Sequence, residues 1–223
     1  MWLWNTWCGK NCDEVWGQIS SRGTGSNFYS SAVIDHLTTQ FRTNSDIGIA
    51  CLYADYKDQT NQNLGHILGS FLRQLLTTPI EPIPISHEIT QKLHHIQHQG
   101  GKLGVEDTLA LLKIHLDQLK CAFICIDAVD ELEPQVRRQL LNKLKELGTN
   151  NTRLFLTGRQ HIESEIQKYF QVEDKYRVII KPHYDDIQEF LQQQIRDDPI
   201  EDAMDNVLKK NIISVIIRKS QEM

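Results

Sequence analysis

The stretch FICIDAVDEL, residues 123–132, decides the fold of this 223-residue chain. Six apolar residues at 121–126 run directly into Asp127, a pattern typical of a strand buried on both faces of a parallel sheet. Open α/β sheets bind their ligands at the carboxyl ends of the strands. The stretch therefore predicts a strand that carries a carboxylate to a binding site.

Strands and helices alternate on either side of this stretch. Apolar runs predict strands at residues 15–19, 47–53, 153–157 and 176–180. Helical spacing of apolar residues predicts helices at 28–41, 64–75, 86–99, 105–119, 134–147 and 162–169, and helical structure from 184 onward. Such alternation predicts an α/β fold with a parallel sheet that helices cover on both faces.

Composition excludes several classes of protein. Hydrophobic residues make up 40% and charged residues 24%, which is an ordinary globular mixture. The net charge of −5 disfavours nonspecific binding to nucleic acid or to an anionic membrane. No run approaches the ~18 apolar residues of a membrane span, and the first residues lack the pattern of a signal peptide. With five cysteines, an odd number, we expect reduced thiols in a cytoplasmic protein.

Two weak metal motifs are set aside. Cys8 and Cys12 are spaced like half of a zinc site, but no second half follows. His94 and His98 lie four residues apart on a predicted helix without the acid of an HExxH pattern. A locally packed or disordered start and a solvated helix face are the simpler interpretations.

The acidic stretch has a specific chemical interpretation. Asp127 would hold Mg²⁺ through water, since this cation prefers oxygen ligands. Asp130 and Glu131 would position or polarise an attacking water. The next predicted strand ends at Thr157-Gly158-Arg159, and the Arg159 guanidinium can recognise a γ-phosphate. The competing interpretation is an acidic loop and a surface arginine without a ligand.

In this order, IDAVDEL (126–132) and LFLTGR (154–159) resemble the Walker B and sensor-1 segments of NACHT-type STAND ATPases. The similarity is greatest to the fungal nephrocystin-like N-terminal group and covers about residues 30–223. It also includes the segments SSAVIDHL (30–37), DIGIACLYADYKDQT (46–60), GSFLRQLL (69–76) and GGKLGVEDTLALLK (100–113).

The resemblance implies a P-loop NTPase fold. We expect a three-layer α/β sandwich with a mostly parallel five-stranded sheet, in which the acidic strand lies beside the phosphate-loop strand. The expected organisation is a divergent segment at 1–22 that can include the first strand, the NTPase core at 23–183 and the start of a C-terminal helical lid at 184–223.

The resemblance also implies a function. ATP or ADP and Mg²⁺ would be the cofactors, and the core would switch conformation with bound nucleotide and self-associate. Relatives are multidomain signalling proteins with an effector and a repeat-built sensor, both absent from this chain. Many fungal relatives act in self/non-self recognition and regulated cell death.

The phosphate loop departs from the family pattern GxxxxGK[ST]. The candidate nucleotide-binding residues are Gly23, Thr24, Gly25, Ser26 and Asn27. Ser26 stands where the lysine belongs, and Asn27, a weak Mg²⁺ ligand, stands where Ser or Thr belongs. Loss of one ionic hydrogen bond costs about 1.5–3 kcal/mol. Nucleotide binding would therefore be about ten- to a hundredfold weaker.

The altered phosphate loop leaves more than one function open. It also leaves open whether the chain is an enzyme. The chain is a nucleotide switch, or a pseudo-NTPase scaffold that no longer binds nucleotide. A misread or frame-shifted N-terminus explains the damage better than ancient loss, since the catalytic acids survive. A metal-dependent nuclease that uses the three acids is a weaker reading, because the net charge is negative.

Overall fold

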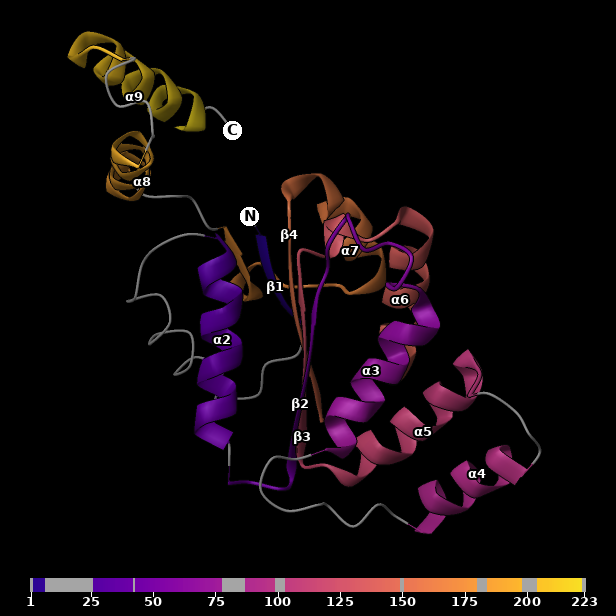
Figure 1. Cartoon of the computed structure of the whole chain (residues 1–223). Helices are drawn as coiled ribbons and strands as arrows, with labels where there is room; N and C mark the ends of the chain where they lie inside the picture. The colour runs from indigo at the N-terminus through magenta and orange to yellow at the C-terminus, as the bar shows by residue number, and fades with distance from the viewer. Residues whose placement is uncertain are drawn as a thin grey trace.

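The computed structural model describes residues 2–6, 26–41, 43–77, 87–98, 103–148, 151–179, 184–197 and 204–221. One sheet of strand order β2-β3-β4-β1-β5 forms its centre (Figure 1). The strands are β1 (Trp2–Thr6), β2 (Ile47–Tyr53), β3 (Cys121–Asp127), β4 (Thr152–Gly158) and β5 (Arg177–Ile179). The strand expected at 15–19 lies outside the described residues.

Strands β2, β3 and β4 form a parallel sheet, as the sequence predicts. We expected the acidic strand to lie beside the phosphate-loop strand, and this expectation is wrong. Both edges of β3 are paired, one with β2 and the other with β4, so β4 separates β3 from β1. Strand β1 is antiparallel to both β4 and β5. It lies within the divergent segment 1–22, earlier in the chain than the strand expected at 15–19.

Helices fall close to the predicted positions. Each predicted boundary lies within two residues of the observed one, as expected for helix ends. The helices are α2 (Ser26–Phe41), α3 (Leu64–Leu76), α4 (His87–His98), α5 (Val105–Gln118), α6 (Pro134–Leu147), α7 (Glu163–Tyr169), α8 (Tyr184–Arg196) and α9 (Asn206–Gln221).

Side chains of the parallel strands alternate between two apolar cores. On one face, α2 packs Val33, Ile34 and Leu37 against Cys125 and Phe155. The opposite face of the same strands joins the core formed with α3, α5, α6 and α7. Helices therefore cover both faces of the parallel strands, as their continuous apolar sequences predict (Figure 1).

The outer edge of β2 is closed by a side chain. The Gln74 amide of α3 accepts a hydrogen bond from the Cys51 N–H (2.9 Å) and donates one to the Cys51 carbonyl (2.9 Å). Gln74 thus satisfies two of the backbone groups that a further strand would use.

Helices α8 and α9 pack against each other beyond the sheet (Figure 1). They confirm the helical structure expected from residue 184 onward. None of the described helices is both long enough and apolar enough to cross a membrane.

Candidate functional site

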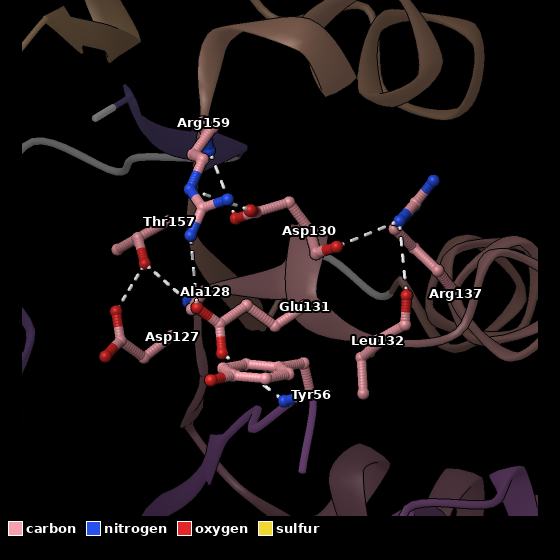
Figure 2. Close-up of polar contacts among 9 residues, drawn as sticks. All are labelled: Tyr56, Asp127, Ala128, Asp130, Glu131, Leu132, Arg137, Thr157 and Arg159. Carbon is pink, nitrogen blue, oxygen red and sulfur yellow. Dashed lines mark hydrogen bonds and ion pairs between the residues drawn. The ribbon is translucent and has the colours of Figure 1, made fainter. Parts of the chain in front are cut away.

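The carboxylate at the end of β3 is tied to the end of β4. Asp127 is 8% exposed and Thr157 is fully buried. The Thr157 hydroxyl donates to Oδ1 of Asp127 at 2.5 Å, and its oxygen accepts from the Ala128 N–H at 2.8 Å (Figure 2). One hydroxyl therefore fixes the Asp127 carboxylate and the start of the following turn.

Beyond Asp127 the backbone turns sharply. Ala128 adopts left-handed angles (φ 53°, ψ 45°) and is the non-glycine residue with positive φ among the described residues. A short 3₁₀ turn, η1 (Val129–Glu131), follows. Its first residue, Val129, and the next residue after it, Leu132, are buried in the core. A left-handed alanine costs about 1–2 kcal/mol, so the surrounding contacts must impose this conformation.

The η1 turn directs two acids towards Arg159. Oδ1 of Asp130 accepts from the Arg159 N–H (3.1 Å), and the Arg159 guanidinium lies 3.5 Å from both Asp130 Oδ2 and Glu131 Oε1 (Figure 2). The Asp130 side chain is only 4% exposed, whereas that of Arg159 is 71% exposed. The long pair between this exposed guanidinium and the partly exposed Glu131 contributes about 0–1 kcal/mol, so it can be exchanged at low cost. The Asp130 side chain is buried, and it keeps the hydrogen bond from the Arg159 N–H when the guanidinium moves.

The end of a third strand, β2, completes this edge of the sheet. Tyr53 on β2 is paired in register with Asp127, and the Ala54 N–H donates to the Asp127 carbonyl (3.0 Å). The Tyr56 N–H donates to Oε2 of Glu131 (3.4 Å), so the loop after β2 contacts the acidic turn (Figure 2). Burial, with neighbouring Cys51, Asp35 and Asp127, raises the pKa of Tyr53. Its phenol stays neutral at physiological pH.

A buried arginine holds the turn from behind. Nη1 of Arg137, on α6, donates to the carbonyls of Asp130 and Leu132, both at 3.2 Å (Figure 2). Its Nε and Nη2 donate to Oε2 of Glu165 on α7, at 3.0 and 2.9 Å. The Arg137 guanidinium thus donates to carbonyls that the 3₁₀ turn does not itself pair, and Glu165 balances its charge.

Comparisons with known proteins place this arrangement in a family. A family model described as Nephrocystin 3, N-terminal, matches residues 4–159, well over half of the chain. The chain belongs to the nephrocystin 3 N-terminal family. The match to that family ends at Arg159 and therefore includes all the residues that meet at the ends of β3 and β4.

Other comparisons add little to the family match. A solved structure of PCH-2 from C. elegans resembles the chain at 15% identity and a TM-score of 0.29. That match covers 92% of this chain and 55% of the PCH-2 chain, so the chain spans about half of PCH-2. A search of curated proteins finds no match.

For this member of the nephrocystin 3 N-terminal family, the structure brings together four predicted site residues. Asp127, Asp130, Glu131 and Arg159 lie at one edge of the sheet (Figure 2). The predicted phosphate-loop residues 23–25 lie outside the described residues. Ser26 and Asn27 form the beginning of α2, which runs antiparallel to β2 and starts at the edge where the parallel strands end (Figure 1).

The two weak zinc motifs gain no support. Cys8 and Cys12 lie outside the described residues. The rings of His94 and His98 stack with centroids 6.3 Å apart on α4. Over the described part of the chain, no group of three or more metal-binding side chains comes together.

Sequence reasoning missed three contributors to the site. Thr157 appeared only as a small polar residue at a strand end, although its register with β3 makes it the partner of Asp127. Ala128 gave no signal, since its φ depends on the turn. Arg137 is one of several polar residues on the amphipathic helix α6, so its sequence position gave no signal. Only the pairing of β3 with β4 and the packing of α6 reveal these roles.

Proposed function

We propose that the chain is the nucleotide-binding switch module of a NACHT/STAND-type signalling ATPase with an altered phosphate loop. The observation that supports this most is the meeting of Asp127, Thr157 and Arg159 at the ends of adjacent parallel strands. Open α/β sheets use this position for ligands. Family membership, with the match covering both strands, is compatible with it.

The residues present fit a magnesium-bound phosphate. Carboxylate oxygens are hard donors, and Asp127 is held by the Thr157 hydroxyl in one orientation. Mg²⁺ is commonly bound by one or two carboxylates together with phosphates and water, so an all-protein cage is not needed. When bound, the ion would neutralise phosphate charge, with Asp127 as its support and Asn27 as a weak second ligand.

The remaining residues would recognise the state of the nucleotide. Arg159 is exposed and held by Asp130 and Glu131 at 3.5 Å, so an arriving γ-phosphate competes for the guanidinium on favourable terms. The released acids would then be available to orient water. A change in these contacts would shift the conformation of the module, with α8 and α9 as the start of its lid.

A second candidate function is a scaffold that has lost nucleotide. The observation in its favour is the pair Ser26 and Asn27 at the start of α2, in place of lysine and a hydroxyl residue. This candidate predicts the same fold without a ligand. Self-association through the core and attachment to effector and sensor domains are compatible with both functions.

Titration with a fluorescent ADP analogue in the presence and absence of Mg²⁺ tests the proposal. We expect saturable binding in Mg²⁺ that Asp127→Asn weakens at least tenfold. The matched control is Asp117→Asn, at an exposed position on α5, which should bind like the wild type. Absence of saturable binding at high micromolar concentrations would favour the scaffold.

A further inference from the structure

The acidic turn η1 is held by contacts of three kinds. On the sheet side, the Thr157 hydroxyl accepts from the Ala128 N–H. Within the turn, the Glu131 N–H donates to the Ala128 carbonyl (2.8 Å) and the Leu132 N–H to the Val129 carbonyl (3.4 Å). The third contact, from Arg137 on α6, reaches the turn from the opposite side to the strands.

Arg137 binds backbone carbonyls at the positions that carry or adjoin the two acidic side chains of the turn. Its Nη1 binds the carbonyl of Asp130 itself and the carbonyl of Leu132, which directly follows Glu131. Glu131 therefore lies between two carbonyls fixed to one guanidinium, and the Asp130 carbonyl belongs to the residue that carries the other acidic side chain. Movement of this guanidinium would change the direction of the Asp130 and Glu131 carboxylates towards Arg159.

Glu165 on α7 fixes the orientation of the Arg137 guanidinium. It binds Nε and Nη2, which leaves Nη1 directed at the turn. The two side chains are mostly buried, with 10% of Arg137 and 20% of Glu165 exposed. A lysine has a single donor centre, so it cannot bridge two carbonyls and a carboxylate with this fixed fork.

We infer that Arg137, oriented by Glu165, is a positioning residue that sets the direction of the Asp130 and Glu131 carboxylates at the nucleotide-facing edge of the sheet. For its effect on nucleotide chemistry this inference rests on the proposed function. Its structural part, control of the η1 turn, does not.

The test compares single and paired substitutions on α6 and α7. Removal of one partner leaves a buried charge, whereas replacement of both by apolar residues of similar size is commonly tolerated. The main variant is therefore Arg137→Met with Glu165→Leu, and Arg137→Lys is the conservative variant. Arg138→Met, at an exposed position one residue along α6, is the control.

Hydrogen exchange of backbone amides gives the first readout. We expect the amides of Glu131 and Leu132 to exchange at least tenfold faster in the paired variant, with the amides inside β3 unchanged and the control identical to wild type. Arg137→Lys should give a smaller acceleration at the same two amides. Unchanged exchange at these amides in the paired variant overturns the inference. If the paired variant fails to fold, unchanged exchange in Arg137→Lys overturns it.

Nucleotide turnover gives the second readout. We expect at least a tenfold lower kcat in the paired variant, with the affinity for Mg²⁺·ADP within threefold of the wild type, because the acids are displaced while Asp127 is not. Equal losses of kcat and affinity would contradict a positioning role. If the wild type binds no nucleotide, the proposed function fails, while the exchange result still decides whether Arg137 controls the turn.

Discussion

The hydroxyl of Thr157 on β4 lies 2.5 Å from Oδ1 of Asp127 on β3 and donates a hydrogen bond to it. The same oxygen accepts the Ala128 N–H, so one fully buried side chain organises both the carboxylate and the turn behind it. Adjacent parallel strands make this possible, because their carboxyl ends lie at the same edge of the sheet.

Removal of this hydroxyl should lower both the stability of the fold and the affinity for the metal-bound nucleotide. Thr157→Val leaves the Ala128 N–H and the Asp127 oxygen without this partner, which costs about 1–3 kcal/mol of unfolding free energy. It should also weaken Mg²⁺·ADP binding at least tenfold. Thr157→Ser loses one buried methyl group, about 1 kcal/mol, but should keep the affinity. Urea denaturation and fluorescent-ADP titration measure both effects, and equal affinities for the two variants would contradict the role of the hydroxyl.

The left-handed Ala128 should respond to glycine with a gain in stability. Ala128→Gly removes the steric cost of positive φ and should raise the unfolding free energy by about 1 kcal/mol. Ala110→Gly, inside α5, is the matched control and should lower it by about 1 kcal/mol. Changes of the same sign in the two variants would argue against the observed turn.

Two glycine-to-alanine substitutions should change the stability of the fold in opposite directions. A Cβ at Gly48 would lie 2.7 Å from side-chain carbons of both Leu75 and Leu119. Gly48→Ala should therefore destabilise the sheet by about 1–3 kcal/mol. Gly69 lies in α3 with nothing within 4 Å of the added carbon, so Gly69→Ala should stabilise by about 0.5–1 kcal/mol. Denaturant unfolding distinguishes these outcomes.

Burial of His115 should make stability depend on pH. Its Nε2–H donates to the Leu75 carbonyl (3.1 Å), and burial lowers its pKa below the usual 6.5, against a smaller opposite effect of that hydrogen bond. Below about pH 6.5 the unfolded chain therefore binds a proton that the folded chain does not. Stability should fall as the pH decreases from 7.5 to 5.5, by at most about 1.4 kcal/mol per unit from this group.

The contribution of His115 can be isolated by substitution. His115→Gln retains a donor for the Leu75 carbonyl and removes the titration, so its stability profile should be flatter over this range. The control His94→Gln, at an exposed position on α4, should keep the slope of the wild type. A His115→Gln profile as steep as that of the wild type would contradict this account.

The elements of the parallel sheet could be predicted because each residue pattern is local. The run that ends at Asp127 is apolar without interruption from 121 to 126, and the strand that ends at Gly158 has the apolar centre 154–156. Strands buried on both faces need such apolar runs. The strand order could not be predicted in the same way. The sequence of a buried strand does not indicate which strands pair with it. The placement of β4 between β3 and β1 depends on contacts between residues distant in sequence.

The site could be predicted only as far as its charged residues. The sequence indicates these charged residues because they stand at or just after the ends of predicted strands: Asp127, Asp130, Glu131 and Arg159. Thr157 and Arg137 act through cross-strand register and helix packing, which single-sequence patterns do not encode. The left-handed angles of Ala128 follow from these contacts, and alanine has no intrinsic preference for them.

Electron paramagnetic resonance of Mn²⁺, a surrogate for Mg²⁺ that accepts the same oxygen ligands, tests the central claim most directly. With ADP present, the wild type should bind one Mn²⁺ per chain, and Asp127→Asn should abolish the bound signal while Asp117→Asn retains it. Binding that is equal in the wild type and Asp127→Asn, or no ADP-dependent binding in the wild type, would contradict a nucleotide-bound metal at the end of β3.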